Sequence, residues 1–344
     1  MEIKYEYSLD LNDLLRERKL TIAVSTYQAG KLVLIGPGEN EPTVSFHQFD
    51  RPMGMACDGK TFAIAANDIL WFMRNNRSIP DSAHPGKTYD ACYLAREAHV
   101  TGEIQSHDVR WVGEELWVVN TRFSCLCTLD PKYSFVPRWK PPFITELASE
   151  DRCHLNGLAV DETGPRFVTA LGESNEKQGW RPNKVDGGCL IDVRTNQVLI
   201  RGFAMPHSPR LHQNRLWLLD SGSGSLLRFA PEQGGCETIG RFPGFTRGLS
   251  FHDNLAFVGL SKIRETSTFG GMPIADRRQE LKCGVGIVDI RTGALAGTIE
   301  FLTGVEEIFD VHVLPGVANL GFRGPHALKE ERETIWVVPQ QRSS

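Results

Sequence analysis

The sequence predicts an all-β fold, a six-bladed β-propeller. Polar motifs recur at the starts of apolar runs, and each run crosses a turn into a second one, as residues 109–112 and 116–119 do, which is the pattern of a β-hairpin. Aligned on the position after each polar cluster, the repeats start 55, 48, 52, 39 and 63 residues apart, a spacing typical of propeller blades. The aligned positions are Gly54, Val109, Gly157, Pro209, Gly248 and Val311.

The fourth repeat shows the four strands of a blade most plainly. Turn-forming residues at 213–214 and 222–224 separate the first three of its four apolar runs. These runs are residues 208–212, 215–220, 226–230 and 236–242. Sheets of four antiparallel strands are the units from which propellers are built.

The sixth repeat begins late in the sequence, at residues 308–314, without clear partner strands after it. Three apolar runs stand before the first repeat, at residues 20–27, 31–36 and 43–49. We therefore expect the ring to close by combining both ends of the chain in one blade, which leaves no sheet edge exposed. Residues 1–344 would then form a single propeller domain, although the chain after Leu314 has no assigned place.

The composition excludes several classes of protein. Hydrophobic residues make up 41% of the sequence and charged residues 23%, as in an ordinary protein with a large core. A net charge of -4 argues against a nucleic-acid surface, which normally carries a basic stripe. We find neither a membrane-length apolar stretch nor the apolar segment of a signal peptide. We therefore expect a cytoplasmic protein without nucleic acid or membrane as a partner. Its eight cysteines lack the paired spacing of a zinc ribbon.

One face of the predicted propeller gathers the polar motifs. In a four-stranded meander, the start of the first strand and the end of the second lie on the same face. First strands begin with histidine and arginine motifs, and second strands end near Tyr27, Asn120 and Arg122. Because function collects on such loops, we expect one functional rim. Long insertions at residues 172–187 and 261–283 are candidate lids over it.

Three histidines could form a metal site at this rim. His107, His154 and His207 start the inner strands of three blades, and imidazole is a common ligand of Zn, Cu, Fe and Ni. Hydrogen-bonded histidines without a metal are the alternative. Oxygen ligands for a hard cation could instead come from Asp108, Asn156 and Asp310.

Basic residues form a second group at the expected rim of a protein that is acidic overall. Guanidinium groups gathered in this way suit a carboxylate, a phosphate or a sulfate. Alternatively, each arginine pairs with a nearby carboxylate and braces a loop. The candidates are Arg122, Arg152, Arg181, Arg210, Arg247, Lys262 and Arg264.

Other chemistries find little support in the sequence. No Gly-x-Ser-x-Gly elbow occurs between a strand and a helix, as nucleophilic hydrolases require. The Gly-Gly pairs at 187–188 and 270–271 do not precede helices, so a dinucleotide fingerprint is absent. We therefore expect no redox cofactor.

The motifs resemble those of a mostly bacterial family of unknown function, over nearly the whole chain. The matching segments are STYQAG from Ser25, NTRFSCL from Asn120, DRCHLNGLA from Asp151, MPHSPR from Met205, PGFTRGL from Pro243, GLSKIRE from Gly259 and EEIFDV from Glu306. This resemblance supports the rim as the site but implies no particular reaction.

A weaker similarity links the sequence to the six-bladed propellers of the gluconolactonase, regucalcin and paraoxonase group. Residues 156–159 resemble their Asn-Gly-Leu-Ala motif, whose asparagine binds a central divalent cation, so the resemblance implies Asn156 as a ligand with Asp310 or Asp108. Their Glu-Gly-Pro motif has no counterpart, since Met53-Gly54 stands in its place. The histidines resemble, more loosely, the zinc site of peptidyl-glycine lyase propellers.

These patterns predict a metal-dependent hydrolase or lyase for an anionic small molecule or peptide-like substrate at the channel mouth. The metal would be Zn, Cu, Fe or Ni rather than Ca. The rival prediction is a non-catalytic propeller that binds an acidic ligand or protein partner through an arginine-rich rim. The assigned residues are, for the metal, His107, His154, His207 and Asn156; for the substrate, Arg122, Arg152, Arg181, Arg210, Arg247, Arg264, Tyr27 and Asn120; and for proton transfer, Asp108, Asp310 and His312.

Overall fold

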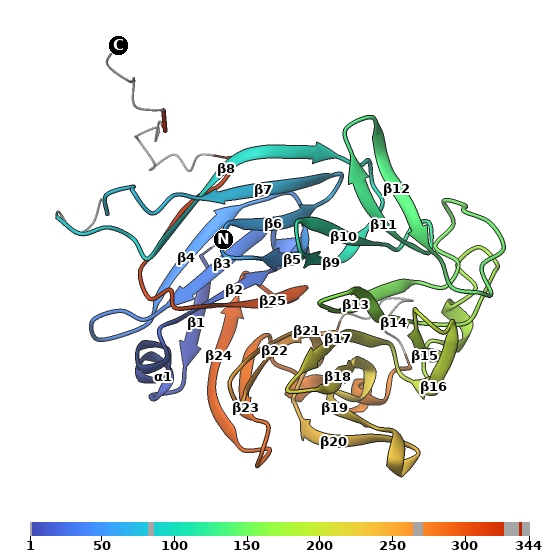
Figure 1. The fold of residues 1–344 in the computed structure, drawn as a ribbon. Helices are drawn as coiled ribbons and strands as arrows, with labels where there is room; N and C mark the ends of the chain where they lie inside the picture. The colour runs from blue at the N-terminus through green and yellow to red at the C-terminus, as the bar shows by residue number, and fades with distance from the viewer. Residues whose placement is uncertain (1, 82–85, 264–270, 327–336, 339–344) are drawn as a thin grey trace.

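Six β-sheets form a ring around a central axis (Figure 1), which confirms the predicted six-bladed β-propeller. The computed structural model describes residues 2–81, 86–263, 271–326 and 337–338. Each sheet has a four-stranded antiparallel core that runs from an inner strand to an outer one, and the six inner strands are neighbours around the axis.

Blades 1 to 3 follow one another along the chain. Blade 1 contains β5 (Pro52–Cys57), β6 (Thr61–Ala66), β7 (Ile69–Asn75) and β8 (Ala91–Val100). Blade 2 contains β9 (Ser106–Val112), β10 (Glu115–Asn120), β11 (Cys125–Asp130) and β12 (Tyr133–Trp139). Blade 3 contains β13 (Leu155–Asp161), β14 (Gly164–Ala170), β15 (Gly188–Asp192) and β16 (Gln197–Phe203).

Blade 4 has the four strands expected from its sequence, and blade 5 repeats the pattern. Gln213 and Asn214 join the first two strands of blade 4 with φ angles of 50° and 56°, as a two-residue type I′ turn requires. Blade 4 contains β17 (Pro206–His212), β18 (Arg215–Asp220), β19 (Ser225–Ala230) and β20 (Gly235–Arg241). Blade 5 contains β21 (Phe245–His252), β22 (Leu255–Ser261), β23 (Gly284–Asp289) and β24 (Leu295–Thr303).

Blade 6 closes the ring with strands from both ends of the chain, as predicted. Its order is β25-β2-β3-β4, with the late strand β25 innermost. The strands are β2 (Leu20–Ser25), β3 (Lys31–Gly36), β4 (Thr43–Gln48) and β25 (Asp310–Pro315). Two further strands were not predicted: β1 (Lys4–Tyr7) extends blade 5 beside β24, and β26 (Leu320–Arg323) pairs in parallel with β8 of blade 1.

Helices are few and short among the described residues. The helix α1 (Leu11–Arg18) precedes β2 and buries Leu11 and Leu15 in a core cluster with Phe301 of blade 5. The 3-10 helices are η1 (Tyr27–Ala29), η2 (Arg181–Asn183), η3 (Ser221–Ser223), η4 (Pro231–Gln233) and η5 (Pro273–Glu280). All of these except η4 follow the second strand of a blade, on the face where the sequence places the functional rim.

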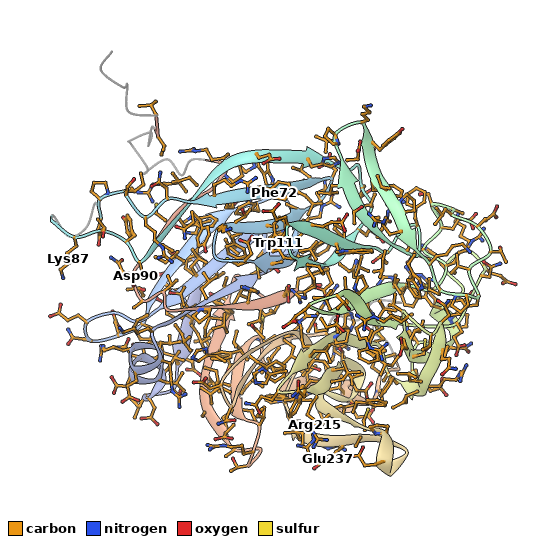
Figure 2. The ribbon with its side chains drawn as sticks, viewed as in Figure 1. Phe72, Lys87, Asp90, Trp111, Arg215 and Glu237 are labelled. Atoms are coloured by element: carbon orange, nitrogen blue, oxygen red, sulfur yellow. The ribbon has the colours of Figure 1, made fainter. Side chains whose placement is uncertain are left out.

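The hydrophobic core lies between neighbouring blades. Phe62 and Met73 of blade 1 pack with Leu32 of blade 6 in one buried cluster. Phe72 of blade 1 and Trp111 of blade 2 adjoin (Figure 2), with ring centroids 6.2 Å apart. Because each blade buries its faces against two neighbours, the ring holds the starts of all inner strands in fixed positions.

The inner ring alternates between close-packed glycines and polar side chains. A Cβ atom at Gly54 would lie 2.8 Å from the Cα of Asp108, and one at Gly157 would lie 2.3 Å from the Cδ of Pro209, so a larger residue would separate the blades. In the even-numbered blades, Asp108, Ser208 and Asp310 each accept a main-chain N–H from the next blade, namely those of Leu158, Gly248 and Met55. At the remaining junction, a Cβ atom at Gly248 of blade 5 would lie 2.5 Å from the main-chain nitrogen of Val311 in blade 6, so close contacts join all six blades in a ring.

Candidate functional site

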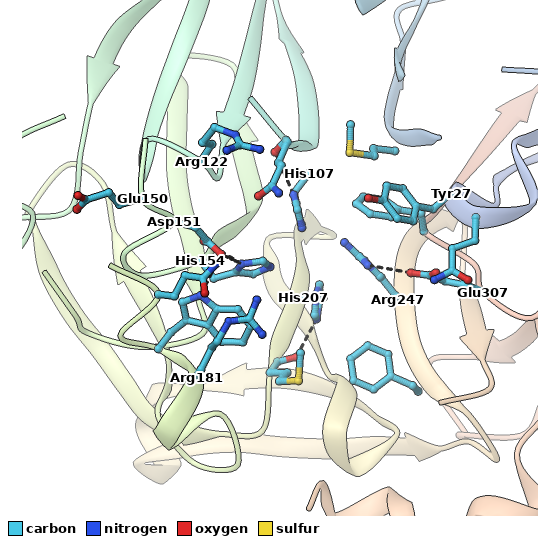
Figure 3. A pocket seen from close by; sticks show the side chains of 18 of the residues that line it. Tyr27, His107, Arg122, Glu150, Asp151, His154, Arg181, His207, Arg247 and Glu307 are labelled. Atoms are coloured by element: carbon cyan, nitrogen blue, oxygen red, sulfur yellow. Dashed lines mark hydrogen bonds and ion pairs between the residues drawn. The ribbon is translucent and has the colours of Figure 1, made fainter. Parts of the chain in front are cut away.

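A cavity of about 460 Å³ lies at the predicted rim, and we call it the channel pocket. Its wall includes Tyr27, His107, His154, His207 and Arg247, which come from five different blades. Figure 3 shows these side chains turned toward a common space. The predicted convergence of the three histidines on one pocket is therefore present in the structure.

Each of the three histidines has its Nδ1 atom hydrogen-bonded to an oxygen atom of the protein. Nδ1 of His107 donates to the carbonyl of Gln105 at 3.0 Å, and Nδ1 of His207 donates to the carbonyl of Met205 at 2.8 Å. Nδ1 of His154 lies 2.9 Å from both carboxylate oxygens of Asp151. Carbonyls and carboxylates only accept hydrogen bonds, so Nδ1 carries the proton in all three rings. The Nε2 edge is left for the pocket.

Left-handed backbone conformations direct two of these rings. Gln105 and Met205 each precede an inner strand with a φ of 55°, and each offers its carbonyl to the histidine two residues later. Positive φ is rare outside glycine, and such strained residues concentrate at functional sites. In blade 3, His154 itself holds this position, with a φ of 49°, which explains its shifted register in the sequence.

Irregular pairing at the inner strands also redirects side chains. The pairing of β17 with β18 shifts register between His207 and Arg210, and the corresponding strand pairs of blades 1, 2, 3 and 5 carry similar shifts. A bulge of this kind changes which way the following residues face. Residues close in sequence therefore reach different parts of the channel.

Burial keeps two of the three imidazoles neutral. It lowers the pKa of His107 well below 6.5, and His154 and Arg247 lower it further. Burial and then Arg247 likewise lower the pKa of His207. At neutral pH these two rings therefore present an Nε2 lone pair to the pocket, ready to accept a hydrogen bond or to bind a metal.

The donor set suits a transition metal, although the rings are not drawn together around one point. Neutral imidazole nitrogens favour Zn, Cu, Fe or Ni over Ca. The rings of His107 and His154 are perpendicular, with centroids 4.8 Å apart. Among the described residues, no group of three or more His, Cys, Asp or Glu side chains is placed to hold a metal ion.

Arg247 is the cation that the pocket presents most directly. Its guanidinium carbon lies 3.4 Å from the ring centroid of Phe309, and its one ion pair among the described residues is with Glu307, at 3.6 Å. Burial removes the water that would stabilise the charged guanidinium, and this lowers the pKa of Arg247 to about 10. Glu307 and other nearby negative groups raise the pKa again, but only in part. An anion in the pocket would supply the missing negative charge.

The other predicted cations differ in their availability. Arg122 and Arg181 line the pocket, but Arg122 also binds the carbonyl and carboxylate of Glu103, and Arg181 lies over the ring of Trp180. Arg152 donates to Glu146, Glu150 and Asn175 and braces the loop outside the pocket wall. Arg264 lies outside the described residues.

Asp108 and Asp310, assigned to proton transfer, lie in a separate network that we call the buried hub, made of Asp108, Arg110, Arg210 and Asp310. Arg210 donates to Asp108 at 2.8 Å and lies 3.7 Å from Asp310, while Arg110 approaches Asp108 at 2.9 Å. The carboxylates also accept main-chain N–H groups from blades 1 and 3. Burial raises the pKa of Asp108 and raises that of Asp310 to about 7. None of the four lines the channel pocket.

The remaining predicted residues have local partners. His312 is near the hub, where burial and Arg210 lower its pKa to about 4. Asn120 accepts the N–H of Phe123 and supports a turn. Asn156, the ligand implied by the lactonase resemblance, accepts a 2.6 Å hydrogen bond from Thr169 and is outside the pocket wall. The structure therefore leaves the histidines, Tyr27 and three arginines at the pocket.

Sequence reasoning missed four side chains that shape the pocket. Asp151 and Trp180 hold His154 from one side, while Glu307 and Phe309 hold Arg247 from the other. Asp151 belongs to a quoted motif and stands three residues before His154, a spacing that could have suggested the pair.

Fold and site together define a six-bladed propeller with a cation-lined pocket at one mouth of its ring. Residues 9–321 match the model of a family described as a domain of unknown function, DUF4915, and the chain belongs to this family. A solved structure titled "Crystal structure of Nidogen/Laminin Complex" contains a similar chain, with a TM-score of 0.53 and 9% identity over 87% of this chain and 99% of that one. At this identity the likeness concerns the fold alone.

No curated protein matches this chain significantly. Within the described part of the chain, no helix has the length and apolar character needed to cross a membrane.

Proposed function

We propose that this protein is an enzyme of the hydrolase or lyase type that acts on an anionic small molecule or peptide-like substrate in the channel pocket, with a divalent metal bound by His107, His154 and His207. One observation carries the proposal: three imidazoles from three blades line one pocket, and each has its Nδ1 hydrogen-bonded to a carbonyl or carboxylate oxygen, which leaves Nε2 for a ligand. Metal-binding histidines in proteins are commonly held in this way.

The protonation of the site supports nitrogen ligation. Because His107 and His207 are neutral at physiological pH, neither has to release a proton before binding a metal. A bound metal would supply Lewis acidity and an activated water. Zn, Cu, Fe and Ni fit imidazole ligands better than Ca does.

Arg247 supports an anionic substrate. Its guanidinium is stacked on Phe309 and incompletely neutralised by Glu307, so a carboxylate, phosphate or sulfate would gain a preoriented partner. Among the described residues, the pocket wall carries the four cations Arg122, Lys177, Arg181 and Arg247 against the three carboxylates Glu150, Asp151 and Glu307. The pocket volume of about 460 Å³ suits a small ligand or the end of a peptide.

A non-catalytic anion-binding propeller is the second candidate, and the position of Arg247 favours it. Arg247 is close enough to His107 and His207 to lower the pKa of both, and the same positive charge would oppose a metal cation between them. In this alternative, the Nε2 atoms accept hydrogen bonds from the ligand, and the arginine binds its negative group.

Metal content separates the two candidates. Elemental mass spectrometry on untagged protein should find about one equivalent of a transition metal, and His154→Ala should lose it. His99→Ala is the matched control, because His99 lies on β8, outside the pocket wall, and hydrogen-bonds only to carbonyls of β12 among the described residues. If wild-type protein holds no metal even after reconstitution, the metal-dependent proposal is wrong and the binding propeller is favoured.

Ligand binding can be tested independently of the metal. Acetate, malonate, phosphate and sulfate should raise the melting temperature to different extents, and Arg247→Met should abolish the response. Arg138→Met is the control, because Arg138 is exposed on β12, pairs with Glu115 and lies outside the pocket wall. An unchanged response in Arg247→Met would contradict the assigned anion site.

A further inference from the structure

Asp151 occupies a junction between one pocket histidine and an insertion of blade 3. Its carboxylate oxygens both lie 2.9 Å from Nδ1 of His154, and Oδ2 also accepts a 3.0 Å hydrogen bond from Nε1 of Trp180. The carboxylate is almost fully buried, so these two N–H donors replace its lost water. Asp151 thus has a defined geometry before any ligand binds.

The main chain fixes Asp151 in place as well. Asp151 and His154 have positive φ angles of 50° and 49°, and the N–H of Asp151 donates to the carbonyl of Arg122 at 2.9 Å. Two left-handed residues within four positions are costly for residues other than glycine. Such strain persists only where surrounding contacts determine the conformation, and it concentrates at functional sites.

Trp180 brings the insertion between β14 and β15 into this arrangement. The indole is 1% exposed and lies 4.5 Å from the ring of His154, measured between centroids. The guanidinium of Arg181 covers the indole at 4.7 Å, and the N–H of Gln178 donates to the carbonyl of Glu150 at 3.0 Å. The insertion is therefore packed onto the segment that carries Asp151.

The three histidines differ in what fixes them. His107 bonds to a carbonyl two residues earlier, and His207 bonds to the carbonyl of Met205 and to the hydroxyl of Ser221, so each ring is oriented by main-chain or hydroxyl oxygens close to its own blade. His154 instead depends on a carboxylate that is itself held by an indole 29 residues away in sequence. Perturbing this link should affect His154 and spare the other two.

We propose that Asp151 is the positioning residue of the site: it fixes His154 with its proton on Nδ1 and its Nε2 lone pair facing the pocket, and Trp180 holds Asp151 in the required orientation. The insertion at residues 172–187 is then part of the functional site rather than a passive loop. The consequence for metal binding rests on the proposed function, whereas the control of the tautomer does not.

Nitrogen-15 NMR of the histidine rings in the full-length protein tests the positioning role. In wild-type protein, His154 should show a protonated Nδ1 and an unprotonated Nε2. Asp151→Asn should give a mixture of tautomers, because an amide can donate to Nδ1 as well as accept from it. Trp180→Phe keeps an aromatic ring but removes the donor, and should give a smaller change in the same direction.

Controls separate this effect from a general loss of structure. Trp139→Phe removes an indole of blade 2 that donates at 2.8 Å to Asn196, between β15 and β16 of blade 3 and outside the pocket wall, and it should leave His154 unchanged. The signals of His107 and His207 should stay the same in every variant. If Asp151→Asn does not fold, Trp180→Phe alone decides the test. A His154 tautomer unaffected by the variants that fold overturns the proposal.

Metal affinity measured by competition with a chelator distinguishes the two proposals. If wild-type protein binds a metal, Asp151→Asn should weaken it by about 10-fold to 100-fold, the usual effect of removing a carboxylate behind a histidine ligand. If wild-type protein binds none but the tautomer still changes in Asp151→Asn, the metal-dependent function is wrong while the positioning role stands. An unchanged metal affinity together with an unchanged tautomer contradicts the positioning role itself.

Discussion

The channel pocket and the buried hub both combine arginine with carboxylate groups and both draw residues from β9 and β17, but they differ in how completely their polar groups are paired. In the hub, Arg210 is shared by Asp108, Asp310 and main-chain carbonyls of blades 3 and 5. In the pocket, Arg247 has one long ion pair among the described residues, and the Nε2 edges of the histidines are left for a ligand. The more completely paired network holds blades together, whereas the less completely paired one is available to a ligand.

The largest expected difference between hub and pocket is the loss of stability when Arg210 or Arg247 is replaced. Arg210→Met should lower the free energy of unfolding by about 3–5 kcal/mol, because it leaves two buried carboxylates without their shared cation. Arg247→Met should change it by less than about 1 kcal/mol, because methionine can still pack on Phe309 and the incompletely neutralised charge is removed. Urea unfolding of both variants measures the contrast, and equal losses would contradict the division between hub and pocket.

The hub should also make the free energy of unfolding depend on pH. Burial raises the pKa of Asp310 from 3.8 to about 7, so between these values the folded state binds a proton that the unfolded state has released. Its contribution to stability is therefore present below about pH 4 and is lost as the pH rises toward 7, with a slope of at most about 1.4 kcal/mol per pH unit.

Asp310→Asn should flatten this decline. The variant keeps a side-chain oxygen that can accept a main-chain N–H but cannot ionise. Chemical denaturation of wild type and variant at several pH values between 4 and 8 provides the measurement. Parallel curves for the two proteins would show that Asp310 titrates normally.

The pocket histidines should make stability depend on pH in the opposite direction, and to a smaller extent. Burial lowers the pKa of His207 below its usual 6.5, so the unfolded state binds a proton more readily, and stability is lost as the pH falls below about 6.5. His207→Gln should reduce this acid-side loss, as seen in the same series of denaturation curves. A variant as acid-sensitive as wild type would mean that His207 is not held neutral.

Much of the architecture follows from local sequence patterns. Paired apolar runs, turn residues such as those at 213–214 and the spacing of polar motifs predict six blades and their closure from both chain ends. The outer strands β1 and β26 were missed because their four residues each gain strand character only by pairing with β24 and β8.

The site was only partly predictable. The motif starts placed His107, His154 and His207 on one rim, since the order of strands in a meander fixes which face each start occupies, and all three line the channel pocket. The sequence could not distinguish Arg210 from Arg247, since both follow similar polar starts. Register shifts at the inner strands decide which of the two turns into the hub and which into the pocket.

The sequence by itself determined the repeated blade and the face on which its polar residues gather, because side-chain alternation and turn formation depend on neighbours in the chain. Only the tertiary structure decided which of those residues are paired with one another and which remain available to a ligand. Arg210 and its partner Asp108 are 102 positions apart, and Asp151 meets Trp180 through an insertion folded back onto the rim. Charge pairing depends on distances set by the packing of separate blades, and no local pattern encodes those distances.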